Sequence, residues 1–472
     1  MHKTIIKIEE IHNYLYENLM LKPDLNLVEK YNQPGPRYTS YPTAPHFTEE
    51  VDHSELIRES ASETGNLSLY FHIPFCKSLC WFCGCTKIIT KKREPSIAYM
   101  ETLKKEILQY LPNIKPGRKV QQLHFGGGTP NYLDPDLIDD FADFLQQHFT
   151  FTEDAELSAE LDPRTMTEAH MKAFKRLGIN RVSFGVQDVK IETQKAVNRV
   201  QSDEQNTDSI SWAKEAGIDS LNIDLIYGLP HQTPESIRDT IQQVLKYSPD
   251  RLAVFSYAHV PWISPAQKIL ERNGLPSAEE KIQMLGVIIE ELTSPAAGYQ
   301  YIGMDHFAKV DDSLAVAQRN KTMQRNFQGY STFSNLEICA FGMSSISQTS
   351  NSYRQNAKDL ADYTEMVNLG KPPIVKGLIL TDEDHIRRTT IMRLMCDLEL
   401  NYEAMSDKLG IDFKIHFADA LAGMDGFIAD GLVELSDSAL KVTPQGSLFV
   451  RNIAMNFDEH LVKGIAKHSK TV

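Results

Sequence analysis

Cysteine is scarce in this chain, with 6 residues in a total of 472. So low a count excludes a disulfide-stapled scaffold, because such domains carry many cysteines in a short chain. The first ten residues include Lys3, Lys7, Glu9 and Glu10, which is not the pattern of a secretory leader. We therefore expect a cytoplasmic protein whose cysteines stay reduced and available for chemistry.

Long hydrophobic runs and an excess of positive charge are also missing. No apolar run approaches the roughly 20 residues of a membrane span, so we expect no membrane partner. A net charge of -14 disfavours general binding of nucleic acid, which needs a basic surface. We interpret the run of Lys87, Lys91, Lys92 and Arg93 as a solvated loop, although a local basic patch stays open. With 42% hydrophobic residues, the chain can bury one large domain and a smaller unit.

Three of the cysteines are close together. Cys76, Cys80 and Cys83 are separated by three and then two residues, and they follow a β-rich run over residues 67–72. Thiolates at this density suit an iron-sulfur cluster or zinc. In a four-iron cluster, three cysteines leave one iron without a protein thiolate and open to an outside molecule.

Zinc is the main alternative for this loop. A structural zinc site has four ligands, and here His72 or Cys85 would have to complete the tetrahedron. Cys339 and Cys396 are isolated and distant in the sequence, so no second cysteine pair exists.

Strand-like and helical segments alternate through the middle of the chain, which is typical of consecutive βα units. The pattern predicts strands over residues 67–73, 120–125, 155–160, 181–185, 220–225 and 251–257. It predicts helices over 97–111, 136–148, 167–177, 205–216 and 233–246. Six such units with right-handed crossovers predict an α/β fold with a partial or complete parallel (β/α) barrel.

Polar residues follow the predicted strands, at the end where parallel barrels place their active sites. They are Gly126, Gly127, Gly128, Thr129, Glu160, Asp162, Gln187, Asp224 and His259. Each has a plainer alternative, because glycines form tight turns and acidic residues cap helices. Arg199 could equally be a surface cation.

The two ends of the chain look like accessory units. We expect residues 1–50 to be an extension folding over a core at 51–370, since Pro34 to Pro45 reads as extended chain. Residues 371–472 read as a small, mostly helical domain with a hairpin over 432–435 and 440–442, similar to a winged helix. Such modules often bind DNA, but the acidic balance favours a docked lid. No pairing helix is evident, so we expect a monomer.

Several motifs resemble a known superfamily. Cys76 to Cys83 resembles the cluster motif of radical S-adenosylmethionine enzymes, and Gly126 to Pro130 resembles their methionine-binding glycine motif. Further blocks are similar to bacterial oxygen-independent coproporphyrinogen III oxidases, and they lie at 36–43, 70–76, 83–85, 185–188, 224–230 and 303–308.

The resemblance implies a 4Fe-4S cluster and S-adenosylmethionine, from which one electron generates a 5′-deoxyadenosyl radical. It implies that two propionates of coproporphyrinogen III become vinyl groups, giving protoporphyrinogen IX for haem synthesis. An electron donor such as a flavodoxin or ferredoxin is implied as a partner.

The resemblance also implies roles for individual residues. Cys76, Cys80 and Cys83 match the cluster ligands, and Cys85 matches a required cysteine that is not a ligand. Tyr70, Gly127 and Glu160 match contacts to the S-adenosylmethionine on the cluster. A second S-adenosylmethionine site is matched by Phe82, Gly128, Thr129, Gln187, Arg199, Asp224, Ala258 and Ile346.

A tetracarboxylate substrate needs cationic partners, and arginine pairs with carboxylates through two parallel hydrogen bonds. We take Arg37 and Arg325 as the candidates. A salt bridge or a position on a helix surface would explain either arginine as well.

Two rival functions are open to test. A haem-binding chaperone branch of the superfamily lacks the cysteine matching Cys85 and the block at 37–42, and both are present here. The other rival is a zinc-dependent regulator that would use the winged-helix region on DNA.

Overall fold

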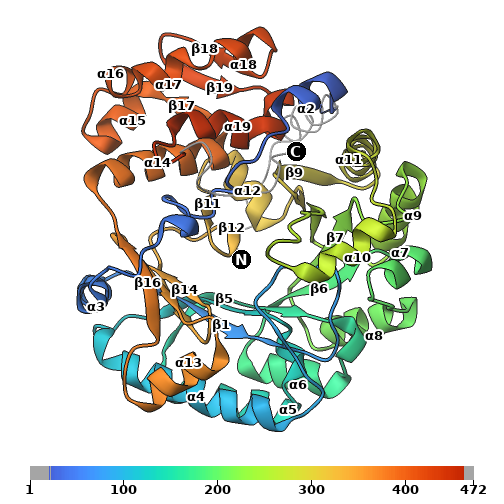
Figure 1. Cartoon of the computed structure of the whole chain (residues 1–472), viewed down its shortest axis with the longest axis vertical. Helices are drawn as coiled ribbons and strands as arrows, with labels where there is room; N and C mark the ends of the chain where they lie inside the picture. Colours follow the sequence, from blue (N-terminus) through green and yellow to red (C-terminus); the bar gives the residue numbers. More distant parts are fainter. Residues whose placement is uncertain (1–20, 22, 462–472) are drawn as a thin grey trace.

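The computed structural model of this chain describes residue 21 and residues 23–461. Its centre is a sheet of twelve strands in the order β16-β15-β14-β13-β1-β4-β5-β6-β7-β8-β10-β9. The six predicted strands are adjacent in it and parallel. They are β1 (Leu67–Ile73), β4 (Val120–Gly127), β5 (Phe151–Leu161), β6 (Arg181–Gln187), β7 (Ser220–Tyr227) and β8 (Arg251–Ser256). The sheet curves into a partial barrel, which confirms the predicted fold class (Figure 1).

The predicted helices lie on the outside of this curved sheet (Figure 1). They are α4 (Glu94–Tyr110), α5 (Pro135–His148), α6 (Glu168–Leu177), α8 (Asp203–Glu215) and α9 (Pro234–Leu245). Apolar strand residues face them: the ring of Phe71 lies 5.1 Å from that of Phe125 on β4 and 5.1 Å from that of Phe141 on α5. Since side chains alternate along a strand, the neighbouring residues point into the barrel, and many of these are polar. None of the described helices is both long and apolar enough to cross a membrane.

Additional strands extend the parallel sheet at both edges. On one side β13 (Glu337–Phe341) pairs parallel with β1, and β14 (Ile346–Gln348), β15 (Ser352–Asn356) and β16 (Ile374–Ile379) follow in antiparallel order. On the other side β8 pairs antiparallel with β10 (His306–Lys309), which pairs with β9 (Tyr299–Gly303). The two edge strands, β16 and β9, do not pair with each other, so the barrel stays open.

The C-terminal unit has its own small core and a three-stranded sheet in the order β17-β19-β18. Its elements include α14 (Asp382–Asp397), β17 (Glu399–Asn401), α15 (Tyr402–Leu409), β18 (Val433–Leu435), β19 (Ala439–Val442) and α19 (Val450–Ala454). The antiparallel pair β18–β19 confirms the predicted hairpin. β16 belongs to the large sheet, although the division at residue 370 assigned it to the C-terminal unit. That three-part division stays a prediction.

The N-terminal segment follows α2 (Leu25–Tyr31) as extended chain between the barrel and the C-terminal unit. Two arginines hold its backbone: Arg325 Nε donates to the carbonyl of Tyr38 at 3.1 Å, and Arg451 Nε donates to that of Pro36 at 2.9 Å. The side chain of Tyr38 is fully buried. The segment is therefore packed into the molecule, and the charged start of the chain lies outside the described residues.

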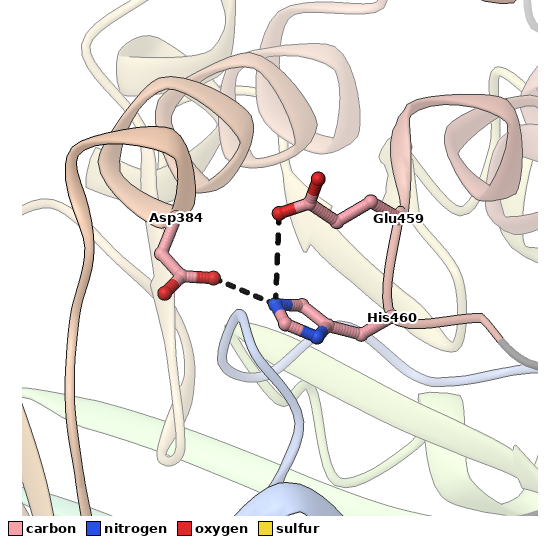
Figure 2. A group of neighbouring side chains, drawn as sticks. All are labelled: Asp384, Glu459 and His460. Carbon is pink, nitrogen blue, oxygen red and sulfur yellow. Dashed lines mark hydrogen bonds and ion pairs between the residues drawn. The ribbon is translucent and has the colours of Figure 1, made fainter.

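The last described turn is tied to the start of α14 (Figure 2). His460 Nε2 lies 2.7 Å from Asp384 Oδ1 and 3.8 Å from Glu459 Oε1. Asp384 also caps its own helix, because it accepts a hydrogen bond from the backbone of Thr381 at 2.9 Å. These contacts fasten this turn beside the N-terminal segment, where the ring of His46 lies 5.2 Å from that of His460.

Candidate functional site

A cavity of about 380 Å³ opens at the carboxyl ends of the parallel strands. The cysteine loop, which follows β2 (Phe75–Cys76), supplies Cys76, Cys80, Cys83 and Cys85 to its wall. This is the end of the barrel at which loops build active sites.

Two arginines lie beside the sulfur of Cys80. Arg164 Nη2 is 3.4 Å from this sulfur and Arg199 Nη1 is 3.6 Å from it. Asp162 fixes both arginines, at 2.6 Å from Arg164 Nη2 and 3.2 Å from Arg199 Nη1. Burial raises the pKa of Asp162, but the charges of Arg199 and Arg164 outweigh it and hold this pKa at about 2. The site therefore carries fixed positive charge next to a sulfur that would be anionic as a metal ligand.

The other cysteines differ in how readily they lose a proton. A hydrogen bond from Cys85 lowers the pKa of Cys83 to about 6, and the ammonium of Lys87 adds to this effect. Lys87 Nζ donates to the carbonyls of Cys83 and Cys85, both at 3.1 Å. Burial and the neighbouring thiols raise the pKa of Cys76 to about 12. Cys76 therefore needs a bound cation to become a thiolate.

The arrangement disfavours zinc. No three of the described histidine, cysteine or acidic residues of the loop bring ligand atoms within 4.8 Å of one another. One tetrahedral zinc would hold sulfurs about 3.8 Å apart, whereas a multi-iron cluster spreads them wider. Both ring nitrogens of His72 are also engaged, with Tyr70 Oη at 3.1 Å and the Thr86 carbonyl at 3.0 Å. The three-cysteine loop fits an iron-sulfur cluster.

The glycine run packs tightly against the end of β1. Gly127 has a φ of 115°, and a Cβ there would lie 2.9 Å from the carbonyl oxygen of Ile73. A Cβ on Gly128 would lie 2.6 Å from the carbonyl carbon of Pro74. Gly127 needs glycine for both conformation and space, and Gly128 needs it for space, so the run does more than form a turn.

Gly128→Ala is expected to destabilise the fold by about 1–3 kcal/mol, since the new methyl group meets backbone that cannot rotate away. Urea unfolding of the cluster-free chain measures this change. Gly286→Ala is the matched control. Gly286 lies in α11 (Ala278–Thr293), and a Cβ added there would lie 3.8 Å from its nearest neighbour, Pro23 Cδ. Equal stability of the two variants would contradict the close packing.

Polar side chains of β1, β4 and β5 form a chain of contacts inside the barrel. The rings of Tyr70 and His124 stack with centroids 5.9 Å apart. His124 Nδ1 lies 2.7 Å from Ser158 Oγ, and His124 Nε2 lies 3.3 Å from Glu160 Oε1. The pKa of Glu160 falls below its usual value, because the hydrogen bond and charge of His124 outweigh the effect of burial. Glu160 thus offers a carboxylate to the cavity.

Asp224 forms a second acidic position, on β7. Burial and the charge of Glu160 raise its pKa to about 7, against hydrogen bonds from Ser183 Oγ at 2.9 Å and Asn222 Nδ2 at 2.7 Å. Arg199 is buried and donates to the carbonyl of Gly185 at 2.5 Å, so it is not a surface cation. The cavity can therefore present both a carboxylate and a carboxylic acid near neutral pH.

Most of the predicted site residues line this one cavity. Besides the four cysteines they are Phe82, Gly127, Gly128, Thr129, Glu160, Gln187, Arg199 and Asp224. Tyr70 does not line the cavity itself, but its ring stacks on that of His124, which does. Ala258 lines a neighbouring cavity, and Ile346 on β14 packs against a cluster containing Phe47 and Tyr353.

The two candidate arginines lie outside this cavity. Arg37 forms an ion pair with Asp305, as the salt-bridge alternative anticipated. Arg325 donates to backbone carbonyls of the N-terminal segment, and its guanidinium lies 4.5 Å from the ring centroid of Tyr330. Arg325 thus anchors the N-terminal segment in this structure.

Sequence reasoning missed charged residues deeper in the barrel. Arg181 Nη1 lies 3.1 Å from Glu156 Oε2, and Arg251 Nε lies 2.8 Å from Asp312 Oδ1. Three of these, Arg181, Glu156 and Arg251, also line the cavity. Each of the three lies in a predicted strand. A charged residue inside a strand was therefore the signal in the sequence that could have identified them.

Comparisons with known proteins agree with this site. Residues 70–244 match the radical SAM superfamily, and residues 380–449 match the HemN C-terminal domain. The oxygen-independent coproporphyrinogen III oxidase of Helicobacter pylori strain J99 is 41% identical over 95% of this chain and 99% of its own length. That of Salmonella typhimurium is 44% identical over 93% of this chain and 95% of its own.

A solved structure agrees as well. The coproporphyrinogen III oxidase (HemN) of Escherichia coli, described as a radical SAM enzyme, superposes with a TM-score of 0.88 at 41% identity. It covers 93% of this chain and 100% of the solved chain. This chain therefore belongs to the oxygen-independent coproporphyrinogen III oxidases of the radical SAM superfamily.

Proposed function

We propose that this chain converts coproporphyrinogen III to protoporphyrinogen IX without oxygen, turning two propionates into vinyl groups in haem biosynthesis. The observation that carries the proposal is the three-cysteine loop at the mouth of a parallel barrel, in a chain that matches the oxidases over nearly its whole length. A 4Fe-4S cluster with S-adenosylmethionine, when bound, supplies the electron and the 5′-deoxyadenosyl radical.

Different residues of the cavity have different roles in this reaction. Cys76, Cys80 and Cys83 would hold three irons of the cluster, and Arg164 and Arg199, which lie beside the sulfur of Cys80, would offset the negative charge of the sulfur ligands. Asp162 holds both guanidinium groups in place, so this positive charge stays beside the sulfur of Cys80.

S-adenosylmethionine is placed by the glycine run and the polar strand residues. The Glu160 carboxylate suits its ammonium group, and the absent side chain at Gly127 lets backbone groups approach it. Tyr70 supports this site through its stacking on His124. For the second S-adenosylmethionine, the proposal draws on Phe82, Gly128, Thr129, Gln187, Arg199 and Asp224 of the main cavity, with Ala258 and Ile346 as outer contributors.

An electron donor and an oligomeric state complete the proposal. The one-electron donor is a flavodoxin or ferredoxin, and the enzyme acts as a monomer. The cysteine Cys85, which lines the cavity, and the packed N-terminal segment both favour the oxidase over the chaperone branch.

The assay that tests the function is anaerobic. Reconstituted protein with coproporphyrinogen III, S-adenosylmethionine and dithionite should yield the divinyl product and 5′-deoxyadenosine. A colourless protein that carries one zinc and forms neither product would instead support the regulator.

Cys85→Ser is expected to leave the iron content near that of the wild type, because Cys85 is not a cluster ligand, while product formation falls at least tenfold. Its hydrogen bond to Cys83 is one contact that the substitution alters. Iron analysis and product assay on the same sample separate the two effects. Loss of about one quarter of the iron, or of the whole cluster, would mean that Cys85 is a ligand after all.

A further inference from the structure

A second cavity, of about 420 Å³, lies where the barrel, the N-terminal segment and the C-terminal unit meet. Its size falls within the roughly 300–1,000 Å³ usual for small-molecule sites. It is lined by residues of all three parts, among them Arg37, Ala258, Trp262, Lys281, Asp305 and Arg451. The function described so far uses only Ala258 of this set.

Positive charge dominates the wall of this second cavity. Arg37, Lys281 and Arg451 line it, whereas Asp305 is its one carboxylate. Burial lowers the pKa of Arg451 to about 9, and the charge of Arg37 contributes to this shift. In a chain with a net charge of -14, such a grouping of cations favours an anionic ligand.

The cavity also presents aromatic surface. Trp262 is 51% exposed, which is unusual for so large an apolar side chain, while Tyr227 and Tyr257 are buried in the wall. Lys281 Nζ lies 3.5 Å from the carbonyl of Tyr257, and its stem packs over Gly228. Aromatic rings beside cations suit a ligand that combines flat apolar rings with carboxylates.

This second cavity is next to the cluster loop. The loop after β8 supplies Tyr257, Ala258 and Trp262 to the cavity, and the same loop contacts the cysteines on its other side. Ser264 Oγ donates to the carbonyl of Cys83 at 2.9 Å, and Gln267 Nε2 donates to that of Phe82 at 2.8 Å.

The two cavities also share a wall. Phe255 lines the first and Ser256 the second, and likewise His306 lines the first and Asp305 the second. A large ligand in the second cavity therefore lies one strand away from the cluster site.

We propose that the second cavity holds the macrocycle of the tetracarboxylate substrate, with Arg37 and Lys281 pairing with propionates that do not react and Trp262 packing on the pyrrole rings. This inference rests on the proposed function and adds a place and a recognition chemistry for its substrate. In this proposal a propionate shares the guanidinium of Arg37 with Asp305, which is its ion-pair partner in this structure. Arg325 positions the segment that carries Arg37.

The test measures binding without catalysis. Fluorescence titration of the full chain with coproporphyrin III, the stable oxidised tetracarboxylate, gives a Kd, and protoporphyrin IX serves as a dicarboxylate comparison. Arg37→Gln and Lys281→Met should each weaken coproporphyrin III binding about tenfold, with a smaller effect on protoporphyrin IX. Lys172→Met on the outer helix α6 is the matched control, because Lys172 is 72% exposed and lies outside both cavities.

A parallel activity measurement separates this inference from the proposed function. With active wild-type enzyme, both variants should raise the KM for coproporphyrinogen III about tenfold and leave the KM for S-adenosylmethionine unchanged. Unchanged Kd and KM values in both variants would overturn the second cavity as the substrate site while the activity stands. The wild-type protein could instead bind coproporphyrin III tightly, and the two variants more weakly, while the wild-type protein forms no product. That result would count against the proposed function alone.

Discussion

Cys80→Ser is expected to abolish formation of the divinyl product and to remove the brown iron-sulfur absorbance of the reconstituted protein. Serine is a poor ligand for iron in this setting, because its hydroxyl does not ionise near neutral pH and its oxygen is harder than sulfur. Cys80 is the proposed ligand that two arginines approach, at 3.4 and 3.6 Å, so its loss also leaves these charges without a thiolate. We expect at least a thousandfold fall in product formation.

Cys396→Ala is the matched control for that variant. Cys396 is buried in a separate apolar cluster, outside the cysteine loop, and does not itself line the cavity. Iron content, visible absorbance and product are measured on both variants after the same anaerobic reconstitution. A Cys80→Ser protein that keeps four irons and normal turnover would contradict the ligand assignment.

Asp162→Asn is expected to destabilise the cluster-free chain by about 3–5 kcal/mol at pH 7. Asp162 is buried and is the shared partner of Arg164 and Arg199, so the amide leaves the buried guanidinium of Arg199 and the half-buried one of Arg164 without a counter-charge. Urea unfolding gives the free energy change, and Asp136→Asn is the control, since Asp136 is 65% exposed in its pair with Arg93. For this exposed pair we expect a change within about 1 kcal/mol.

The Asp162 prediction carries a pH dependence. The folded pKa of about 2 lies below the unfolded value of about 3.9, so the ionised carboxylate stabilises the fold fully above that unfolded value. The stabilisation is lost as the pH falls from about 4 towards 2. The difference between wild type and Asp162→Asn should therefore narrow below about pH 4. A difference that stays constant down to pH 3 would show that the ion pairs do not account for it.

The periodic part of the fold could be predicted from the sequence because its signals are local. Strands such as Leu67–Ile73 are buried along almost their whole length and helices such as Pro135–His148 bury one face, and both constraints show in the residue pattern. The added strands β13 to β16 and β9 to β10 gave no such signal. They are short and join the sheet through long-range, partly antiparallel pairing that no local pattern specifies.

The candidate site could be predicted where chemistry is carried by residues close in sequence, as in the cysteine loop and the glycine run. The contacts that Arg37 and Arg325 make in this structure could not, since their partners, Asp305 and the backbone of the N-terminal segment, are about 270–290 residues away. The pairing of Arg164 with Cys80 was missed for the same reason: the two residues are 84 positions apart. The sequence around an arginine does not distinguish one that binds a ligand from one that holds a loop in place.

The central claim is a cluster with three cysteine ligands and one open iron that S-adenosylmethionine can bind. The most direct test is electron paramagnetic resonance of the anaerobically reconstituted, dithionite-reduced protein, recorded with and without S-adenosylmethionine labelled with ¹⁷O or ¹⁵N in its methionyl group. The account predicts four irons per chain, a spectrum that shifts on addition, and hyperfine coupling to the label. An unshifted spectrum without coupling, from a cluster held by four thiolates, would contradict it.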